Sequence, residues 1–419
     1  MTMSETTISR EQPHRGDVLI LSKWHSGAVG PLAKLLHERG WRAVLMTAES
    51  EDRNEDACDE VVRVDWDEDQ ITDVAEAIAS AGVQPAAVVN VVDVLMGWQV
   101  QLAEHFGVRG PAPEYVDLVD KSAVRSMLFR EGLSQMRFLS CLAGESPAWT
   151  IYPAVVKPAV QSGGSAFVRV VHDDTERAAA MRDIAETYGG GASILIEEYI
   201  TGSEFSLDVV IQDSGLIPLL AVEKVDRGAE ETRDRGLLVT PPVSQRVSAA
   251  ADELASMLEA MVKALGIKGG WLHVEARVDE QRVEIIEINP RCGGGTYMHA
   301  VKQRHGLDPL EYQIDLYLPD GPPAVVASHD LNPRWLGLVP LDTLEAGNVR
   351  LQFTYRDLMS VPNVIDAIVF EHFVSSGSER ENIFTMVLFG GDDLVSLRAT
   401  ERLVYAATPY WVEAAPKSS

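Results

Sequence analysis

At 419 residues the chain is longer than one ordinary domain, so we expect two to four structural units with more than one core. Apolar residues make up 46% of the chain and charged residues 24%, which is typical of a soluble globular protein. The 63 acidic residues against 36 basic ones give a net charge of −27. Because the sequence shows no local basic patch, this charge excludes general binding to nucleic acid or to anionic membranes.

The cysteines and the N-terminal residues indicate the compartment. Cys58, Cys141 and Cys292 form neither a CxxC pair nor an even disulfide framework, which favours a reducing environment. Residues 1–17 are polar and lack the apolar segment of a signal peptide, and no run of about 18 apolar residues occurs. We therefore expect a cytoplasmic protein that does not span a membrane.

Apolar segments alternate between strand-like and helix-like patterns after a polar start at residues 1–15, which we expect to be disordered. This alternation predicts an N-terminal α/β domain over residues 16–112, with a small parallel sheet. The turn after the first strand lacks GxGxxG, so it is interpreted as a helix entry and not as a dinucleotide site. The expected elements are strands at 17–21, 42–47 and 86–93 and helices at 30–40 and 71–82.

A linker around Pro111 and Pro113 leads to a helix for which Asp120 is the candidate N-cap. The remainder is richer in strands and predicts an α+β fold, with a C-terminal α+β region at 326–419. The expected elements are a hairpin of 153–158 with 167–171, strands at 192–200, 204–211 and 216–225, and helices at 248–267 and 398–407.

Residues 270–278 and 283–289 predict an antiparallel hairpin that carries acidic side chains. If Asp279 pairs with Val283, then Glu275 lies opposite Glu287. His273 and Asn289 share the face of the two glutamates. The opposite face is the core side, formed by Leu272, Val274, Ala276, Val278, Ile286 and Ile288.

Two carboxylates placed opposite each other repel, so we expect a cation between them. Glu275, Glu287 and Asn289 supply oxygen ligands that suit Mg²⁺. The following Arg291 offers a planar fork for an anion, and residues 293–295 are glycines that allow a ligand close to the backbone. A solvated polar strand face is the alternative interpretation.

Cations for nucleotide phosphates occur earlier in the chain, although no GxxxxGK[ST] sequence is present. Lys157 precedes a turn that contains Gly163 and Gly164, and Lys121 begins the preceding helix. Backbone amides of such a turn, flanked by lysines, can cover phosphates. Alone, the same residues fit an ordinary hairpin turn.

The order of these segments resembles the ATP-grasp superfamily over residues 121–302. The shared pattern runs from Lys121 and Lys157 through the glycine turn and IEEYITGSEFSLDV to Glu275 and EINPR. The resemblance implies an α/β N-terminal domain followed by α+β ATP-grasp lobes, the small lobe at 113–198 and the large lobe at 199–325. It also implies ATP and Mg²⁺ (or Mn²⁺) as cofactors.

The resemblance further implies a role for each site residue. Lys121 and Lys157 would contact the phosphates and the adenine side, and the adenine would be held by Glu197 with backbone groups of Glu198, Tyr199 and Ile200. Glu204 would bind the ribose. Glu275 and Glu287 would hold Mg²⁺, with Asn289 sharing the metal, and Arg291 would steady an acyl phosphate, so Lys157 and Arg291 are the expected catalytic residues.

The implied activity is that of a carboxylate–amine ligase, which forms an amide through an acyl phosphate and releases ADP and phosphate. The layout is most similar to the L-amino-acid (dipeptide) ligase branch, with small-molecule acids and amines as partners and a homodimer as an open option. The alternatives are a carboxylase that uses bicarbonate, or a regulator that binds ATP without catalysis. Substrate candidates are His273, Arg291, Gly293, Gly294 and His299, although a histidine at 299 is more commonly packed or on the surface.

The charged segment at 224–240 has two interpretations. It is either a linker or a mobile lid in which Lys224 and Arg227 meet phosphate.

Overall fold

The computed structural model describes residues 14–24, 26–160, 164–228, 230–322, 325, 334–377 and 382–414. The chain forms two compact units, Met1–Ala112 with Leu310–Pro323, and Pro113–Pro309 with Ala324–Ser419. Most of the expected N-terminal disordered segment, residues 1–13, lies outside the described residues. No described helix is long and apolar enough to cross a membrane.

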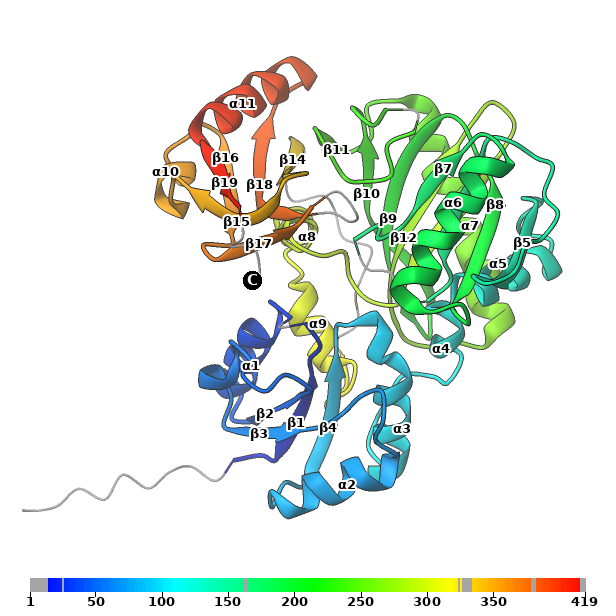
Figure 1. Cartoon of the computed structure of the whole chain (residues 1–419). Helices are drawn as coiled ribbons and strands as arrows, with labels where there is room; N and C mark the ends of the chain where they lie inside the picture. The colour runs from blue at the N-terminus through cyan, green and yellow to red at the C-terminus, as the bar shows by residue number, and fades with distance from the viewer. Residues whose placement is uncertain are drawn as a thin grey trace, which may run out of the picture. The chain divides into compact units, whose positions relative to one another are not determined.

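The first unit contains a four-stranded parallel sheet in the order β3-β2-β1-β4 (Figure 1). Its strands are β1 (Asp17–Leu21), β2 (Arg42–Thr47), β3 (Glu60–Arg63) and β4 (Pro85–Asn90), and its helices are α1 (Val29–Glu38), α2 (Ile71–Ser80), α3 (Met96–Phe106) and α9 (Pro309–Asp315). Every residue of β1 is buried, as expected for a parallel strand covered on both faces. The predicted α/β alternation is confirmed.

The second unit begins with a four-stranded antiparallel sheet in the order β5-β8-β6-β7, called here the small sheet. It comprises β5 (Phe138–Leu142), β6 (Ala154–Pro158), β7 (Arg169–Val171) and β8 (Ser193–Glu198), with α4 (Tyr115–Leu118), α5 (Lys121–Arg130) and α6 (Asp174–Tyr188). The predicted hairpin of β6 and β7 is present. Asp120 caps α5, because its side chain accepts from the backbone N–H groups of Ser122 and Ala123.

The same unit contains an eight-stranded sheet, the large sheet, in the order β13-β12-β9-β10-β11-β14-β18-β16. Its first half comprises β9 (Ser203–Gln212), β10 (Gly215–Lys224), β11 (Leu238–Thr240), β12 (Gly270–Val278) and β13 (Val283–Asn289), with α7 (Gln245–Leu265) and α8 (Thr296–His305). The ends of β12 and β13 are those predicted from the sequence. The change from the small sheet to the large one falls between β8 and β9, where the boundary between the lobes is expected.

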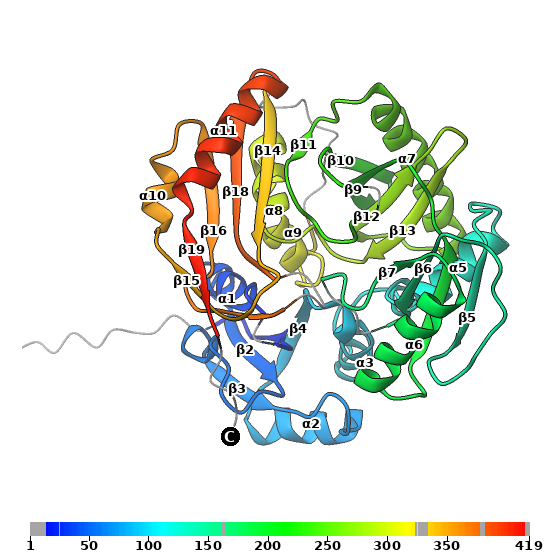
Figure 2. The same ribbon diagram turned by 45° about the horizontal axis from the view of Figure 1, so that its top comes forward.

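The C-terminal residues extend the large sheet with β14, β18 and β16, and α11 lies against them (Figure 2). These elements are β14 (Trp335–Asp342), β16 (Val364–Val369), β18 (Ile383–Gly391), α10 (Tyr355–Met359) and α11 (Leu394–Ala407); a further sheet contains β15 (Ala346–Leu351), β17 (Phe373–Ser376) and β19 (Tyr410–Glu413). The expected α+β content is present.

Two of the expected domain limits differ from the compact units. The expected large lobe and C-terminal region, divided at 325/326, belong to one unit apart from residues 310–323, because β11 pairs with β14 (Leu238 opposite Leu338) and this pairing protects a sheet edge. Residues 310–323, expected in the large lobe, group with the first unit.

Candidate active site

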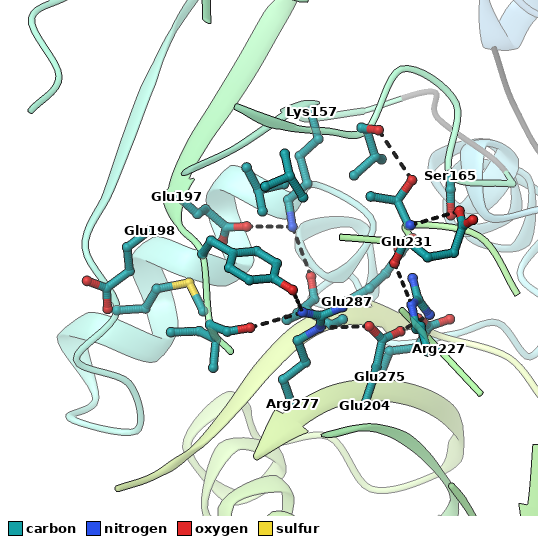
Figure 3. Close-up of a pocket in the computed structure, with 18 residues that line it drawn as sticks. Lys157, Ser165, Glu197, Glu198, Glu204, Arg227, Glu231, Glu275, Arg277 and Glu287 are labelled. Carbon is teal, nitrogen blue, oxygen red and sulfur yellow. Dashed lines mark hydrogen bonds and ion pairs between the residues drawn. The ribbon is translucent and has the colours of Figure 1, made fainter. Parts of the chain in front are cut away.

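A pocket lies between the small sheet and the β12–β13 end of the large sheet (Figure 3). It holds about 610 Å³ of empty space, a figure that includes the part open to solvent. The pocket is lined by these residues predicted from the sequence: Lys157, Glu197, Glu198, Tyr199, Ile200, Glu204, Glu275 and Glu287. The other predicted residues that the structure describes do not line it: Lys121, Gly164, His273, Asn289, Arg291, Gly293, Gly294 and His299.

The predicted opposition of Glu275 and Glu287 is confirmed, and His273 lies opposite Asn289. The register predicted for the start of the hairpin is wrong, because Val283 pairs with Val278 and not with Asp279. The extra residue is taken up by a β-bulge on β13.

The bulge residue is Ile286, which has no partner between the pairs Ala276–Ile285 and Glu275–Glu287. Ile286 was expected in the core, but it lines the pocket, and Ile285 is fully buried in its place. Ile286 and Ile285 differ from their expected faces because a bulge exchanges the faces on which neighbouring residues lie.

Each glutamate of the pair has its own lysine. Lys224 Nζ lies 3.1 Å from Glu275 Oε2, and Lys121 Nζ lies 3.2 Å from Glu287 Oε1. Burial raises the pKa of Glu275; Lys224 opposes this, but neighbouring carboxylates, Asp234 first, add to it, and the pKa lies above its ordinary value. For Glu287 burial also acts to raise the pKa, but Lys121 and then other cations outweigh it, and the pKa lies below its ordinary value.

This donor set fits Mg²⁺. The described residues contain no group of three or more His, Cys, Asp or Glu side chains arranged to hold a metal ion. Two carboxylates that face one pocket, with the amide of Asn289 nearby, nevertheless suit Mg²⁺, which usually takes few protein ligands and fills its shell with water and phosphate oxygens. Glu275 and Glu287 would hold it, and a cation would reduce the repulsion that raises the pKa of Glu275.

On the opposite wall, Lys157 of β6 is held by Glu197 of β8. Their Nζ and Oε2 atoms are 2.6 Å apart, and Arg125 Nε donates to the other oxygen, Oε1, at 2.6 Å. Burial acts to raise the pKa of Glu197, but the charges of Arg125 and Lys157 outweigh it and hold the pKa below its ordinary value. The Glu197 carboxylate, expected at the adenine, therefore binds two cations and orients Lys157.

Glu204, expected to bind the ribose, lines the pocket and is held by three cations. Its carboxylate is buried and accepts from Lys224 Nζ at 2.9 Å, from Arg277 Nε at 2.8 Å and from Arg227. Burial acts to raise the pKa of Glu204, but these three cations lower it to about 2. Its carboxylate therefore fixes cations beside the pocket, and its contact with a ribose stays a prediction.

Some backbone N–H and carbonyl groups of residues 198–200 form hydrogen bonds within the protein. The Glu198 N–H donates to Arg137 O, and the Tyr199 N–H donates to Pro153 O. Arg277 donates to the Ile200 carbonyl at 3.0 Å and stacks 4.9 Å from the ring centre of Tyr199. Tyr199 and Arg277 thus form one wall of the pocket, where a flat ring could lie.

The segment between β10 and β11 borders the pocket through Arg227, Glu231 and Thr232. Thr232 Oγ1 donates to Val168 O beside β7 at 3.4 Å, so the segment reaches the small-sheet side. Lys224 binds Glu204, Asp234 and Glu275, and is thus paired with carboxylates on the large-sheet side. The lid interpretation stays a prediction.

Asp208 of β9 binds residues of β12 and of the glycine turn at 293–295, which follows β13. Its buried carboxylate accepts from the Gly293 N–H at 2.8 Å and from Trp271 Nε1 at 2.9 Å, and lies 2.8 Å from His273 Nδ1. A Cβ atom on Gly293 would lie 2.8 Å from His273 Nδ1, whereas one on Gly294 would meet nothing within 4 Å. Gly293 is thus required by packing against protein, while Gly294 faces open space.

The remaining predicted residues lie at the margins or outside the described residues. Arg291 donates to its neighbour, the Cys292 carbonyl, at 2.9 Å. His299 Nδ1 lies 3.1 Å from Asp366 Oδ2 of β16, which agrees with a packed histidine. Gly163 lies outside the described residues, and Gly164 has φ of +61°, a conformation that favours glycine.

Sequence analysis missed Arg125, Arg277 and Asp208, which hold the predicted residues in place. Arg125 lies four residues after Lys121, on the same face of α5, and Arg277 lies two residues after Glu275 on β12. These spacings could have indicated both residues. Nothing in the local sequence distinguishes Asp208 from a solvated strand residue.

Comparison with known proteins agrees with this geometry. Residues 150–299 match the family described as the ATP-grasp domain. The carbamoyl phosphate synthase large chain of Clostridium acetobutylicum is 25% identical over 190 residues, 44% of this chain and 17% of that one. The D-alanine–D-alanine ligase of Pediococcus pentosaceus is 33% identical over 144 residues, 33% of this chain and 38% of that one. The match thus spans well under half of each relative.

Solved structures match over nearly the whole chain. An L-amino acid ligase from Bacillus licheniformis matches with a TM-score of 0.77 at 18% identity, covering 96% of this chain and 100% of that one. The biotin carboxylase domain of the Hydrogenobacter thermophilus 2-oxoglutarate carboxylase, in complex with MgADP and bicarbonate, matches with a TM-score of 0.68 at 14% identity, covering 95% and 91%. At these identities the likeness shows the fold.

The fold, the paired glutamates and the matched domain lead to one assignment. ATP and Mg²⁺, the cofactors predicted from the sequence, are those of ATP-grasp enzymes. The chain therefore carries an ATP-grasp domain, which the family match places at residues 150–299.

Proposed function

We propose that the chain is an ATP-dependent carboxylate–amine ligase that forms an amide through an acyl phosphate. One observation carries the proposal: a single pocket brings Lys157 of the small sheet against the Glu275–Glu287 pair of the large sheet. Such a pocket can hold a triphosphate between a cationic wall and a metal-binding wall. An ordinary polar strand face would have no reason to meet buried lysines.

The proposed roles follow from the contacts. Lys157 and Lys121 offset phosphate charge, and Glu197 keeps the Lys157 ammonium in the pocket. Glu275 and Glu287 hold Mg²⁺, with Asn289 at the same strand end. When bound, Mg²⁺ neutralises charge on the transferred phosphoryl group.

The adenine and the substrates take the remaining parts of the site. The ring of Tyr199 and the backbone from Glu198 to Ile200 border the space for the adenine. Arg291 and Gly294 follow β13, and a Cβ atom on Gly294 would meet open space. A substrate carboxylate would lie there, and Arg291 steadies the acyl phosphate. The protein contributes positioning and electrostatics, without a covalent bond to the enzyme.

The L-amino acid ligase matches with a higher TM-score than the biotin carboxylase domain and is covered in full. This likeness supports amino acids or related acids as substrates. The matched D-alanine–D-alanine ligase supports the same class. A carboxylase that uses bicarbonate is the second candidate, supported by the match to a biotin carboxylase domain. The expected homodimer stays a prediction.

The test is Mg²⁺- and ATP-dependent ADP release, measured with amino acids singly and in pairs and with bicarbonate. Hydroxylamine is added to trap the acyl phosphate, and products are identified by mass. A dipeptide or hydroxamate mass is the expected result and identifies the acid. ADP release with bicarbonate alone would replace the ligase with the carboxylase, and ATP binding without ADP release on any substrate would favour the regulator.

A further inference from the structure

Arg125 is a buried arginine of α5 whose guanidinium joins the two sheets. Its Nε donates to Glu197 of β8, and its terminal nitrogen Nη2 donates to the Ile285 carbonyl of β13 at 2.6 Å. Its other terminal nitrogen donates to Ser134 Oγ at 3.2 Å and lies 3.7 Å from a Glu284 oxygen. Arg125 is 2% exposed and does not line the pocket, so its role must pass through the residues that it binds.

The β-bulge at Ile286 decides whether the two glutamates can share a face. The hairpin begins with Val278 opposite Val283, and this register, continued without interruption, would put Ile286 opposite Glu275. Glu287 would then turn to the core side of the sheet, because each shift of one residue exchanges the faces. The extra residue restores the pairing of Glu275 with Glu287.

A bulge leaves backbone groups outside the regular ladder, and those groups need other partners. The Ile285 carbonyl accepts from Arg125, and the Ile286 carbonyl accepts from Lys157 Nζ at 3.1 Å. Both cations also bind the same carboxylate, Glu197. Two consecutive carbonyls of the bulge are therefore bound by a charged cluster of Arg125, Lys157 and Glu197.

We propose that Arg125 is a positioning residue that holds the β-bulge at Ile286 and so keeps Glu287 facing Glu275 for the divalent cation. The inference rests on the proposed function, since it assigns the metal to that glutamate pair. Through Arg125, helix α5 on the small-sheet side would influence metal binding at the large sheet. A guanidinium is suited to this role because it donates to a carboxylate and a carbonyl at once in a fixed geometry.

The experiment measures Mn²⁺ binding by electron paramagnetic resonance in the full-length chain, with a non-hydrolysable ATP analogue present. Arg125→Lys keeps the charge but loses the planar fork, and we expect a rise of at least about tenfold in the apparent Kd for Mn²⁺. The matched control is Arg177→Lys, a 6% exposed arginine of α6 that contacts Tyr152 and Asp174. The control should stay within about twofold of the wild type.

Melting temperatures of both variants separate positioning from general stability. The proposal is overturned if Arg125→Lys and Arg177→Lys bind Mn²⁺ alike, whatever their melting temperatures. The double variant Arg125→Met with Glu197→Gln removes both charges of the closest pair, while Glu284 keeps Arg282 and Ser134 as partners, so we expect the variant to fold. Its Kd for Mn²⁺ should remain raised, and a return to the wild-type value would contradict the role of Arg125.

The same measurement distinguishes a failure of the proposed function. A wild-type chain that binds no Mn²⁺ with the nucleotide analogue would refute the metal site itself. Wild-type binding that Arg125→Lys leaves unchanged would refute only the inference about Arg125.

Discussion

Replacing Glu287 with Gln is the most direct test of the metal site. Taken from the sequence alone, the substitution should relieve repulsion with Glu275 and leave the fold largely intact. The structure adds a cost, because Glu287 also loses its ion pair with Lys121, whose Nζ lies 3.2 Å away. The two effects oppose each other.

Their magnitudes are similar. The Glu287 side chain is 32% exposed, so the pair with Lys121 is partly screened and contributes about 1 kcal/mol or less. The repulsion from Glu275 across the strands is also about 0.2–1 kcal/mol. We therefore expect the free energy of unfolding of Glu287→Gln to differ from that of the wild type by less than about 1 kcal/mol.

The metal affinity should change much more than the stability. Loss of one of two carboxylate ligands should raise the Mg²⁺ concentration for half-maximal ADP release at least about tenfold, about 1.4 kcal/mol. The assay is a Mg²⁺ titration of ADP release, together with urea unfolding. Glu413→Gln, which removes an exposed ion pair with Arg350, is the control and should leave the titration unchanged. Unchanged ADP release in Glu287→Gln would refute the metal assignment.

Other expected outcomes concern stability. The pKa of Glu204 is about 2 against an ordinary 4.5, so its ionised form contributes about 3 kcal/mol, fully present above pH 4.5 and lost as the pH falls towards 2. The difference in unfolding free energy between wild type and Glu204→Gln should thus be large at pH 7 and shrink at pH 3, and a difference independent of pH would contradict this. Gly293→Ala, whose Cβ would meet His273 Nδ1 at 2.8 Å, should lose about 1–3 kcal/mol in urea unfolding, while Gly294→Ala should stay within about 0.5 kcal/mol. Equal losses in the two alanine variants would refute the packing argument.

The sequence by itself determined the elements and the chemistry of the strand end. Strands such as β12 and β13 follow from runs of apolar and β-branched residues bounded by turns, and both have the ends that were predicted. Alternation with period two predicted that Glu275 and Glu287 share a face, but in the structure this pairing depends on the bulge at Ile286. Residue types, such as carboxylates followed by Arg291 and glycines, indicated a metal and an anion, because that chemistry depends on local composition.

The tertiary structure decided how those residues are held and which of them are free for a ligand. The bulge at Ile286 escaped prediction because its carbonyl partners, Arg125 and Lys157, lie 160 and 129 positions away in the sequence. Glu197, expected at the adenine, was not expected to bind these two cations as well. Burial makes an unpaired charge costly, so each buried carboxylate takes its partners from whichever elements the fold brings close, and that choice is invisible in a local sequence pattern.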